Sequence, residues 1–532
     1  MRGRRSMSWM VGLVGALVLL GAPACTGGDD QGGEPSAGTG IARDTIRVAI
    51  SEPVGVLNPQ DYTGNHVVLT MVYEPLLRYA ADGSLEPGLA ESYEASDDGL
   101  TYTFTLRDGV TFQDGTPFDA EAARFNLERW VGVPDHNWLG AANYISSIDA
   151  VDDSTLELTL SRPYYPMLQE MSLTRPVRFL SPDSVGPDGE FQEPVGTGPW
   201  MLDSDSDTET VLTRNDSYWG DQPTLSRVEF VVIPDPQARV AALQAGDVDV
   251  LGGEYLAPLA PEDVEVLRSD PGVQVLTAPG TSNLVLAFNA ETGPLADLDV
   301  RQAINMALDR SSMSTALFNG LADPAASVFP TIIPFAASDS PPAFDPDGAN
   351  ELLESAGWTG SPVRSKGGEE LSFDLVLDPS SFPQARSLSE AIKAELADVG
   401  IEVELRPLDS AGYGAAIVQD RDFDMAFFIT YGAPYDPPSS LTNMFESSTA
   451  SDDGKIFTSP RLDDLIGAAL ASTDEATRAD DYERIWAYMS EESAAAPLLQ
   501  QSRMWAVSSD VQGFELGATE YDLPLAGVTI TS

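Results

Sequence analysis

The chain has 532 residues, with 83 acidic and 29 basic side chains and a formal net charge of −54. A field of this sign repels phosphate backbones and argues against nucleic acid as a partner. Cys25 is the only cysteine, which excludes a disulfide framework and a thiolate metal cage. Stability must therefore come from hydrophobic cores, and a chain of this length has room for two or three.

The N-terminus has the pattern of an export signal. Basic residues in MRGRRSMSWM precede the apolar run VGLVGALVLLGA, and the small residue Ala24 precedes Cys25. A basic segment, a short apolar segment and a small-residue cleavage site are typical of a signal peptide. The apolar run is shorter than the about 20 residues that a membrane-spanning helix needs.

A tether is predicted directly after the cysteine. The segment TGGDDQGGEPSAGTG at 26–40 has no large apolar side chain and cannot offset the entropy cost of ordering. Signal, cysteine and tether together resemble a bacterial lipoprotein, in which the cysteine becomes the lipidated N-terminus. Ala22 stands where lipoproteins usually carry Leu, and the alternative is a plain cleavage site that leaves a free thiol. We expect lipidation of Cys25 and anchoring to the outer face of the cell membrane.

The body of the chain reads as α/β. Ile46, Val48 and Ile50 alternate in a half-buried strand, and the segments TYTFTLR and STLELTL alternate in the same way. Asp119 can cap a helix that runs toward Trp130 between these last two strands. Strand, helix and strand within 81–189 indicate a small mixed domain inserted between larger ones.

The second half of the chain repeats strand and helix patterns. Residues 227–251 read as strand, helix and strand, with Gly246 at the helix C-terminus. The segment VRQAINMALDRSSM is predicted as one helix with a core-facing stripe. The segments LSFDLVLD and IEVEL flank a helix that ends at Gly400, which predicts a βαβ unit in a parallel sheet, and FDMAFFIT follows as a buried strand.

Several long segments in order resemble the family 5 extracellular solute-binding proteins. They include YEPLLRYAADGSLEPGLAESYEASDDGLTYTFTLRDGVTFQDGTPFDAEAARFNLER, VGTGPWML and DVRQAINMALDR, and the resemblance covers roughly residues 44–530. Members of this family serve ATP-driven importers of dipeptides, oligopeptides and nickel chelates. The segments at 162–179 and 431–437 are most similar to the nickel-chelate branch.

The resemblance implies a two-lobed α/β fold of the periplasmic-binding-protein type (class II). The two lobes are joined by two hinge strands, and a small α+β domain is inserted in the first lobe. The predicted boundaries are a signal peptide at 1–24, a tether at 25–43, lobe 1 at 44–80, 190–283 and 504–532, the small domain at 81–189, and lobe 2 at 284–503.

The resemblance also implies a ligand site. The nickel-binding branch uses an arginine to grip carboxylates of the metal's chelator, and that position is Arg175 here. A guanidinium suits this role because its planar fork binds a carboxylate through two hydrogen bonds. Aromatic residues wall the chelate in that branch, and the matching positions are Tyr62, Trp138, Tyr431 and Tyr435. The alternatives are a structural ion pair for the arginine and simple packing for the rings.

The two histidines, His66 and His136, align with loops near the expected cleft. Neutral imidazole is a common metal ligand, so we take His136 as a ligand-binding candidate and His66 as a weaker metal candidate. A second carboxylate-binding arginine of the branch is replaced by Asp135, and the segment SSTASDD lacks the branch's histidine. We therefore expect no intrinsic cofactor, and any metal would arrive with its own chelator.

The sequence favours a binding protein over an enzyme. Neither histidine lies beside a G-x-S-x-G serine, and nothing places two catalytic carboxylates together. The resemblance implies a monomeric, extracytoplasmic lipoprotein that hands a carboxylate-bearing solute, such as a nickel complex, to the permease and ATPase subunits of an ABC importer.

Two alternatives stay open. The first is a dipeptide- or oligopeptide-binding protein, in which Asp436 or Asp135 would bind the α-amine of the peptide. The second is a surface receptor that senses the ligand without transporting it.

Overall fold

The structure, a computed structural model, describes residues 43–531 apart from 292, 338–339, 383 and 448–453. The predicted signal peptide, Ala22, Cys25 and nearly all of the predicted tether lie outside the described residues. In the part that is described, no helix combines the length and apolar character needed to cross a membrane.

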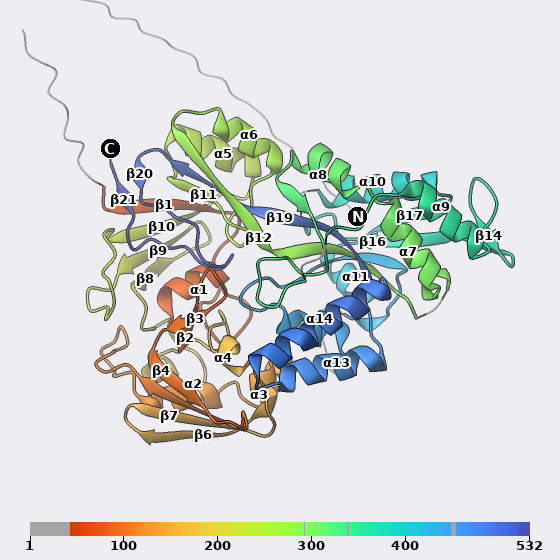
Figure 1. The fold of residues 1–532 in the computed structure, drawn as a ribbon. Helices are drawn as coiled ribbons and strands as arrows, with labels where there is room; N and C mark the ends of the chain where they lie inside the picture. The colour runs from red at the N-terminus through yellow and green to blue at the C-terminus, as the bar shows by residue number, and fades with distance from the viewer. Residues whose placement is uncertain (1–42, 292, 338–339, 383, 448–453, 532) are drawn as a thin grey trace, which may run out of the picture. The chain divides into compact units, whose positions relative to one another are not determined.

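A large mixed sheet of eleven strands organises the fold (Figure 1). Its order is β17-β16-β18-β12-β19-β11-β1-β10-β9-β8, and β13 pairs with β19. The strands are β1 (Thr45–Ile50), β8 (Trp200–Asp205), β9 (Glu209–Arg214), β10 (Arg227–Val232), β11 (Val250–Gly252), β12 (Val273–Phe288), β13 (Ala322–Pro324), β16 (Ser372–Leu377), β17 (Glu402–Pro407), β18 (Met425–Ile429) and β19 (Ala495–Ser508).

Two long antiparallel strands, β12 and β19, join the two ends of this sheet. β19 pairs with β11 on one side, and the second half of β12 pairs with β18 on the other. We call the part built on β1 and β8–β11 lobe 1 and the part built on β16–β18 lobe 2. The β12–β19 register shifts between Pro279 and Asn283, so the ladder is irregular where the chain passes between the lobes.

Helices cover both faces of the lobe 1 sheet. Ala49 of β1 and Val240 of α5 (Pro236–Ala245) belong to the buried cluster on one face. Ile46 and Val48 belong to the cluster on the other face, together with Val68 of α1 (His66–Val72). The alternation in β1 therefore divides its side chains between two helical layers, as the period of two in a strand requires.

Lobe 2 confirms the predicted βαβ unit. β16 and β17 are parallel, and α10 (Ala385–Asp398) connects them. Leu375 of β16 packs in one buried cluster with Leu388 and Ile392 of α10. Val376 points to the opposite cluster, which includes Tyr482 of α14 (Glu475–Glu491).

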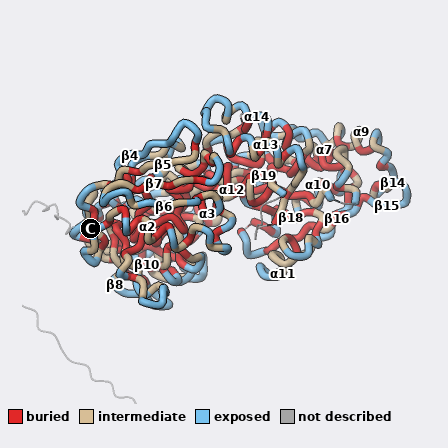
Figure 2. Tube along the Cα trace, turned by 90° about the horizontal axis from the view of Figure 1, so that it is seen from below, coloured by how far each residue is buried: buried red, intermediate tan, exposed pale blue. Residues whose placement is uncertain are grey.

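The small domain has its own four-stranded antiparallel sheet in the order β4-β5-β7-β6. Phe104 pairs with Leu156, and Asp119 caps α2 (Ala120–Glu128) by accepting a hydrogen bond from the backbone N–H of Ala122, as predicted. Buried side chains run without interruption from this sheet to α14 in lobe 2, because they form one cluster. Figure 2 shows buried residues along the strands and flanking helices and exposed residues in the peripheral loops. The strands are β4 (Ala90–Ala95), β5 (Thr101–Leu106), β6 (Ile145–Asp152) and β7 (Thr155–Leu160).

The single helix predicted over VRQAINMALDRSSM is wrong. The segment forms two helices, α7 (Leu298–Ala307) and α8 (Arg310–Phe318). At the break, the side chain of Asp309 accepts a hydrogen bond from the backbone N–H of Ser312 and so caps a new helix.

Short elements complete the described fold. The remaining helices are α3 (Gly140–Tyr144), α4 (Met167–Glu170), α6 (Pro261–Arg268), α9 (Pro346–Ser355), α11 (Ser410–Gly414), α12 (Pro438–Ser440) and α13 (Pro460–Ala471). Single helical turns lie at Pro134–His136, Pro182–Ser184, Pro294–Ala296, Ala415–Gln419 and Leu441–Phe445. The remaining strands are β2 (Leu77–Tyr79), β3 (Leu85–Pro87), β14 (Ser365–Lys366), β15 (Glu369–Glu370), β20 (Val511–Gln512) and β21 (Thr529–Ile530).

Candidate ligand-binding site

The candidate residues predicted from the sequence lie together where loops of the two lobes meet. Each is linked to the next by a ring contact or a hydrogen bond, and two further tyrosines join them. We call this set the aromatic site; its members are Tyr62, His66, His136, Trp138, Arg175, Tyr255, Tyr431, Tyr435 and Tyr521.

Arg175 contacts two members of this set, Tyr62 and His66, and is only 7% exposed. Its guanidinium carbon lies 5.0 Å from the centre of the Tyr62 ring, and its Nη1 donates to the backbone oxygen of Asp61 at 3.0 Å. Its Nη2 donates to the ring of His66. Burial lowers the pKa of Arg175 below its usual value. Arg175 takes part in no ion pair among the described residues, so the structural alternative for this arginine is not supported.

His66 begins α1, whose N-cap is Asn65. The imidazole lies between two tyrosines, with ring centres 5.2 Å from Tyr255 and 5.3 Å from Tyr521. Burial, and then the charge of Arg175, lower the pKa of His66 to about 3. The imidazole is therefore neutral at physiological pH, and its lone pair accepts from Arg175.

His136, Tyr62 and Trp138 form a hydrogen-bonded group on the lobe 1 side. The hydroxyl of Tyr62 lies 2.8 Å from Nδ1 of His136, and Nε1 of Trp138 donates to the same hydroxyl at 2.5 Å. His136 is buried, and burial lowers its pKa. Tyr62 is 46% exposed, so this residue is in contact with solvent.

Lobe 2 contributes Tyr431 and Tyr435 from the loop after β18. The Tyr435 ring lies 6.0 Å from Trp138 and 5.4 Å from Tyr521, centre to centre. The backbone oxygen of Tyr431 accepts from the hydroxyl of Tyr521 at 3.2 Å. Rings from both lobes therefore meet at one point.

Sequence reasoning missed Tyr255 and Tyr521. Their rings stack with centres 4.7 Å apart and planes 24° apart. Tyr255 follows Gly252 and Gly253 at the carboxyl end of β11, a place where α/β folds put ligand-binding residues, and this signal could have been used. Tyr521 lies in the C-terminal segment, and no local pattern marks it.

Buried acids fix the Tyr431–Tyr435 loop to the strand that joins the lobes. Thr281 of β12 donates from its backbone N–H to Glu520 at 2.7 Å, and its hydroxyl accepts from the N–H of Ala433 at 2.9 Å. Asp436 is fully buried, its Oδ2 accepts from the N–H of Gly432 at 2.8 Å, and burial raises its pKa to about 7. Burial and the nearby Glu520 also raise the pKa of Glu254 to about 8.

No cluster of three or more metal-ligating side chains occurs among the described residues. His66 and His136 each touch a different partner, Arg175 and Tyr62 respectively, and do not form a joint site. A metal at the aromatic site would need ligands from a chelator. The two acids that could bind the amine of a peptide differ in their surroundings. One oxygen of Asp436 accepts a hydrogen bond from the backbone of its own loop, whereas Asp135 is exposed and lies beside Tyr62.

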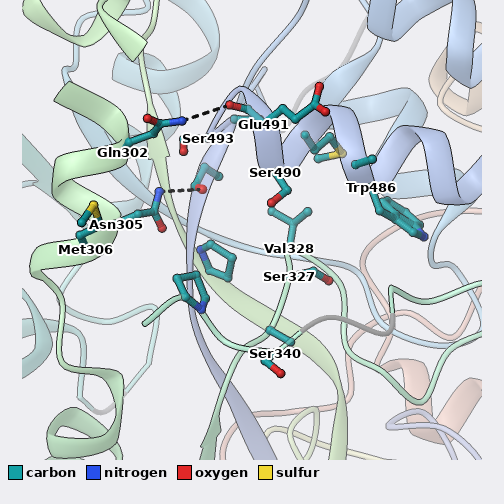
Figure 3. A pocket seen from close by; sticks show the side chains of 17 residues that line it. Gln302, Asn305, Met306, Ser327, Val328, Ser340, Trp486, Ser490, Glu491 and Ser493 are labelled. Carbon is teal, nitrogen blue, oxygen red and sulfur yellow. Dashed lines mark hydrogen bonds between the residues drawn. The ribbon is translucent and has the colours of Figure 1, made fainter. Parts of the chain in front are cut away.

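Lobe 2 has a separate cavity of about 650 Å³ between α7, the end of α14 and the start of β19 (Figure 3). Gln302 Nε2 donates to the backbone oxygen of Glu491 at 3.4 Å, and Asn305 Nδ2 donates to that of Ala495 at 3.4 Å. The side-chain amides of Gln302 and Asn305 thus donate to backbone oxygens of the protein. The cavity contains none of the ligand-binding residues predicted from the sequence.

A family model described as "Bacterial extracellular solute-binding proteins, family 5 Middle" matches residues 84–452. The chain is 37% identical over 476 residues to the nickel-binding periplasmic protein of Escherichia coli (strain K12), covering 87% of this chain and 90% of that protein.

Two solved structures share the fold. The ABC transporter substrate-binding protein from Sinorhizobium meliloti has a TM-score of 0.80 and 42% identity, covering 92% of this chain and 100% of that chain. NikA from Brucella suis, in complex with Fe(III)-EDTA, has a TM-score of 0.85 and 35% identity with the same coverage. These similarities confirm the two-lobed binding-protein fold and the solute-binding role predicted from the sequence. The chain belongs to the bacterial extracellular solute-binding proteins, family 5.

Proposed function

We propose that the protein binds a metal chelate, or a related small carboxylate, at the aromatic site and delivers it to an ABC importer. The observation that carries this proposal is Arg175, a buried guanidinium that forms no ion pair with any described carboxylate, in a chain with 83 acidic residues. A buried cation without a counter-ion is costly, so a ligand carboxylate is the partner that its donors lack. One relative is named for binding nickel and another is bound to Fe(III)-EDTA, a polycarboxylate chelate.

The surrounding residues suit such a ligand. Tyr62, Trp138 and Tyr435 offer ring faces from both lobes, so binding would hold the lobes together. A carboxylate that takes the donors of Arg175 would release the lone pair of His66 beside the chelate. Because this imidazole is neutral, it could then complete the coordination of the cargo metal.

The direct test is to purify the protein and combine native mass spectrometry with elemental analysis. We expect a co-purified metal or a carboxylate-bearing organic mass. Titration calorimetry with nickel–histidine and Fe(III)-EDTA should then give binding that Arg175→Ala weakens by at least about 30-fold, the loss of a charge-assisted pair. Arg386→Ala, at an exposed position of α10, is the matched control and should bind normally. Unchanged affinity in Arg175→Ala would refute the site.

Peptide binding is the second candidate, and the exposed carboxylate of Asp135 beside Tyr62 is the observation that favours it. An acid at this place could bind the α-amine of a peptide. Dipeptides that raise the melting temperature more than the chelates do would decide for this function.

Membrane anchoring through Cys25 is part of the proposal, as are the permease and ATPase partners, a monomeric state and the absence of catalysis. The lipoprotein-like N-terminus supports the anchoring through Cys25. Cys25→Ser should move the protein from the membrane fraction to the soluble extracytoplasmic fraction. Retention in the membrane fraction would contradict lipid anchoring at this residue.

A further inference from the structure

A chamber of about 580 Å³, lined mainly by lobe 1 and by Pro434 of lobe 2, lies next to the aromatic site but separate from it. The two share chain segments, because Thr174, Pro434 and Asp522 line the chamber while their sequence neighbours Arg175, Tyr435 and Tyr521 belong to the aromatic site. No member of the aromatic site lines the chamber. Adjacent residues therefore face opposite sides of a shared wall.

Arg178 lines this chamber and is an unusual arginine. It is 8% exposed, and within the described part of the chain it makes a single hydrogen bond, from Nη1 to the backbone oxygen of Tyr73 at 2.7 Å. Its Nε is buried without a partner, and it joins no ion pair among the described residues. Burial lowers the pKa of Arg178 to about 10, and the guanidinium remains charged.

Glu74 also lines the chamber, but its carboxylate is already occupied. Its carboxylate pairs with Arg78 at 2.6 Å and also accepts from Tyr218 at 2.9 Å, Trp219 at 2.7 Å and Thr197 at 2.9 Å. Four donors saturate a carboxylate, so Glu74 has little capacity left for Arg178. Among the described residues no side chain that lines the chamber accepts a hydrogen bond from Arg178.

Asp522 provides a negative charge in the same chamber. Its Oδ2 accepts from the backbone N–H and the hydroxyl of Thr519, both at 2.9 Å, and its Oδ1 has no partner among the described groups. Asp522 acts on Arg178 through its charge but does not form an ion pair with it. A cation and an anion therefore line one chamber with a gap between them.

We propose that this chamber is a second ligand-binding site, which takes a small zwitterion such as an amino acid. The carboxylate of the ligand binds Arg178 and its ammonium binds Asp522, so one molecule closes the gap between the two charges. The exposed acids Glu86 and Asp221, which also line the chamber, disfavour ligands with several negative charges. Tyr79 and Trp219 in the lining give an aromatic side chain apolar surface.

Titration calorimetry with three related probes tests this inference. L-phenylalanine carries both charges, 3-phenylpropanoate lacks the ammonium group, and 2-phenylethylamine lacks the carboxylate. We expect L-phenylalanine to bind at least about 10-fold more tightly than either of the others, the size of one charge-assisted hydrogen bond. No binding of L-phenylalanine at millimolar concentration, or equal binding of the three probes, would overturn the proposal.

Two variants locate the binding. Arg178→Lys keeps the charge but loses the planar fork, and Asp522→Asn keeps the acceptor for Thr519 but loses the charge; each should weaken L-phenylalanine at least about 10-fold. Should the lysine variant fail to fold, Asp522→Asn decides alone. Arg268→Gln, at an exposed position of α6, is the control and should bind normally.

The second site is independent of the proposed function, and two variants distinguish the two sites. Arg175→Ala should leave L-phenylalanine binding unchanged, whereas Asp522→Asn should leave chelate binding unchanged. Loss of L-phenylalanine binding in Arg175→Ala, with normal binding in Arg178→Lys, would place the amino acid at the aromatic site and refute the chamber.

Discussion

Arg175 in lobe 1 and Arg310 in lobe 2 are both buried arginines, but their surroundings differ. Arg310 is 3% exposed and donates to the backbone oxygens of Pro497, Asn305 and Leu308 at 2.5 to 3.2 Å and to Oδ1 of Asn305 at 2.9 Å. Arg175 has one backbone acceptor, Asp61, and the ring of His66.

This difference distinguishes a structural arginine, Arg310, from a ligand-binding arginine, Arg175. A guanidinium whose three nitrogens all donate to the protein stabilises the fold and has little left for a ligand. One whose donors are partly free carries a desolvation cost that only a ligand can offset. Removing each arginine should therefore have opposite effects on stability and on affinity.

Arg310→Ala should have the largest effect on stability. It leaves the carbonyls of Pro497 and Asn305 without their donor and opens a cavity, so we expect a loss of about 3–5 kcal/mol in the free energy of unfolding. Urea denaturation measures this loss, and the folded fraction should bind chelate normally. An effect below about 1 kcal/mol would contradict the structural role of Arg310.

Asp436→Asn should change how stability depends on pH. Burial raises the pKa of Asp436 to about 7, so the folded protein binds more protons than the unfolded chain between about pH 4 and pH 7. This group therefore costs the wild type stability as pH rises through that window, whereas Asn does not titrate. The variant should gain stability relative to wild type, on the order of 2 kcal/mol, from pH 5 to pH 7. Denaturation at both pH values measures it, and a constant difference would argue that Asp436 titrates normally.

Arg175→Lys should affect affinity and spare the fold. The charge is kept, but the planar fork that binds a carboxylate through two hydrogen bonds is lost, so we expect chelate binding to weaken about 10-fold. Calorimetry measures the affinity, and a melting curve should show almost no shift. A large loss of stability with normal affinity would give Arg175 the role assigned to Arg310.

Trp138→Phe should have the smallest effect. It removes the indole donor to Tyr62 and part of the contact with Tyr435, but it keeps an aromatic wall. We expect chelate affinity to fall about 5-fold, corresponding to about 1 kcal/mol. Calorimetry with the Arg175 variants in parallel would rank the losses of chelate affinity. A larger loss of affinity in Trp138→Phe than in Arg175→Lys would mean that ring contacts contribute more to chelate binding than the carboxylate pair with Arg175.

The sequence by itself determined many of the helices and strands and part of the aromatic site. Period-two alternation placed β1 and β5, and the βαβ pattern that ends its helix at Gly400 placed β16 and α10, because each pattern depends only on neighbours in the chain. A resemblance over long segments singled out Arg175 and the rings of the YGAPYDP loop. The break between α7 and α8 was missed because Asp309 can stand inside a helix or cap a new one, and packing decides which.

Only the tertiary structure decided which groups meet. Tyr255 and Tyr521 are 266 positions apart, and no local rule could stack them around His66. The tie from Thr281 to Glu520 likewise joins segments that are 239 positions apart. Whether a buried arginine keeps free donors, as Arg178 does, or donates from all three nitrogens, as Arg310 does, depends on the acceptors that distant segments bring or do not bring within reach.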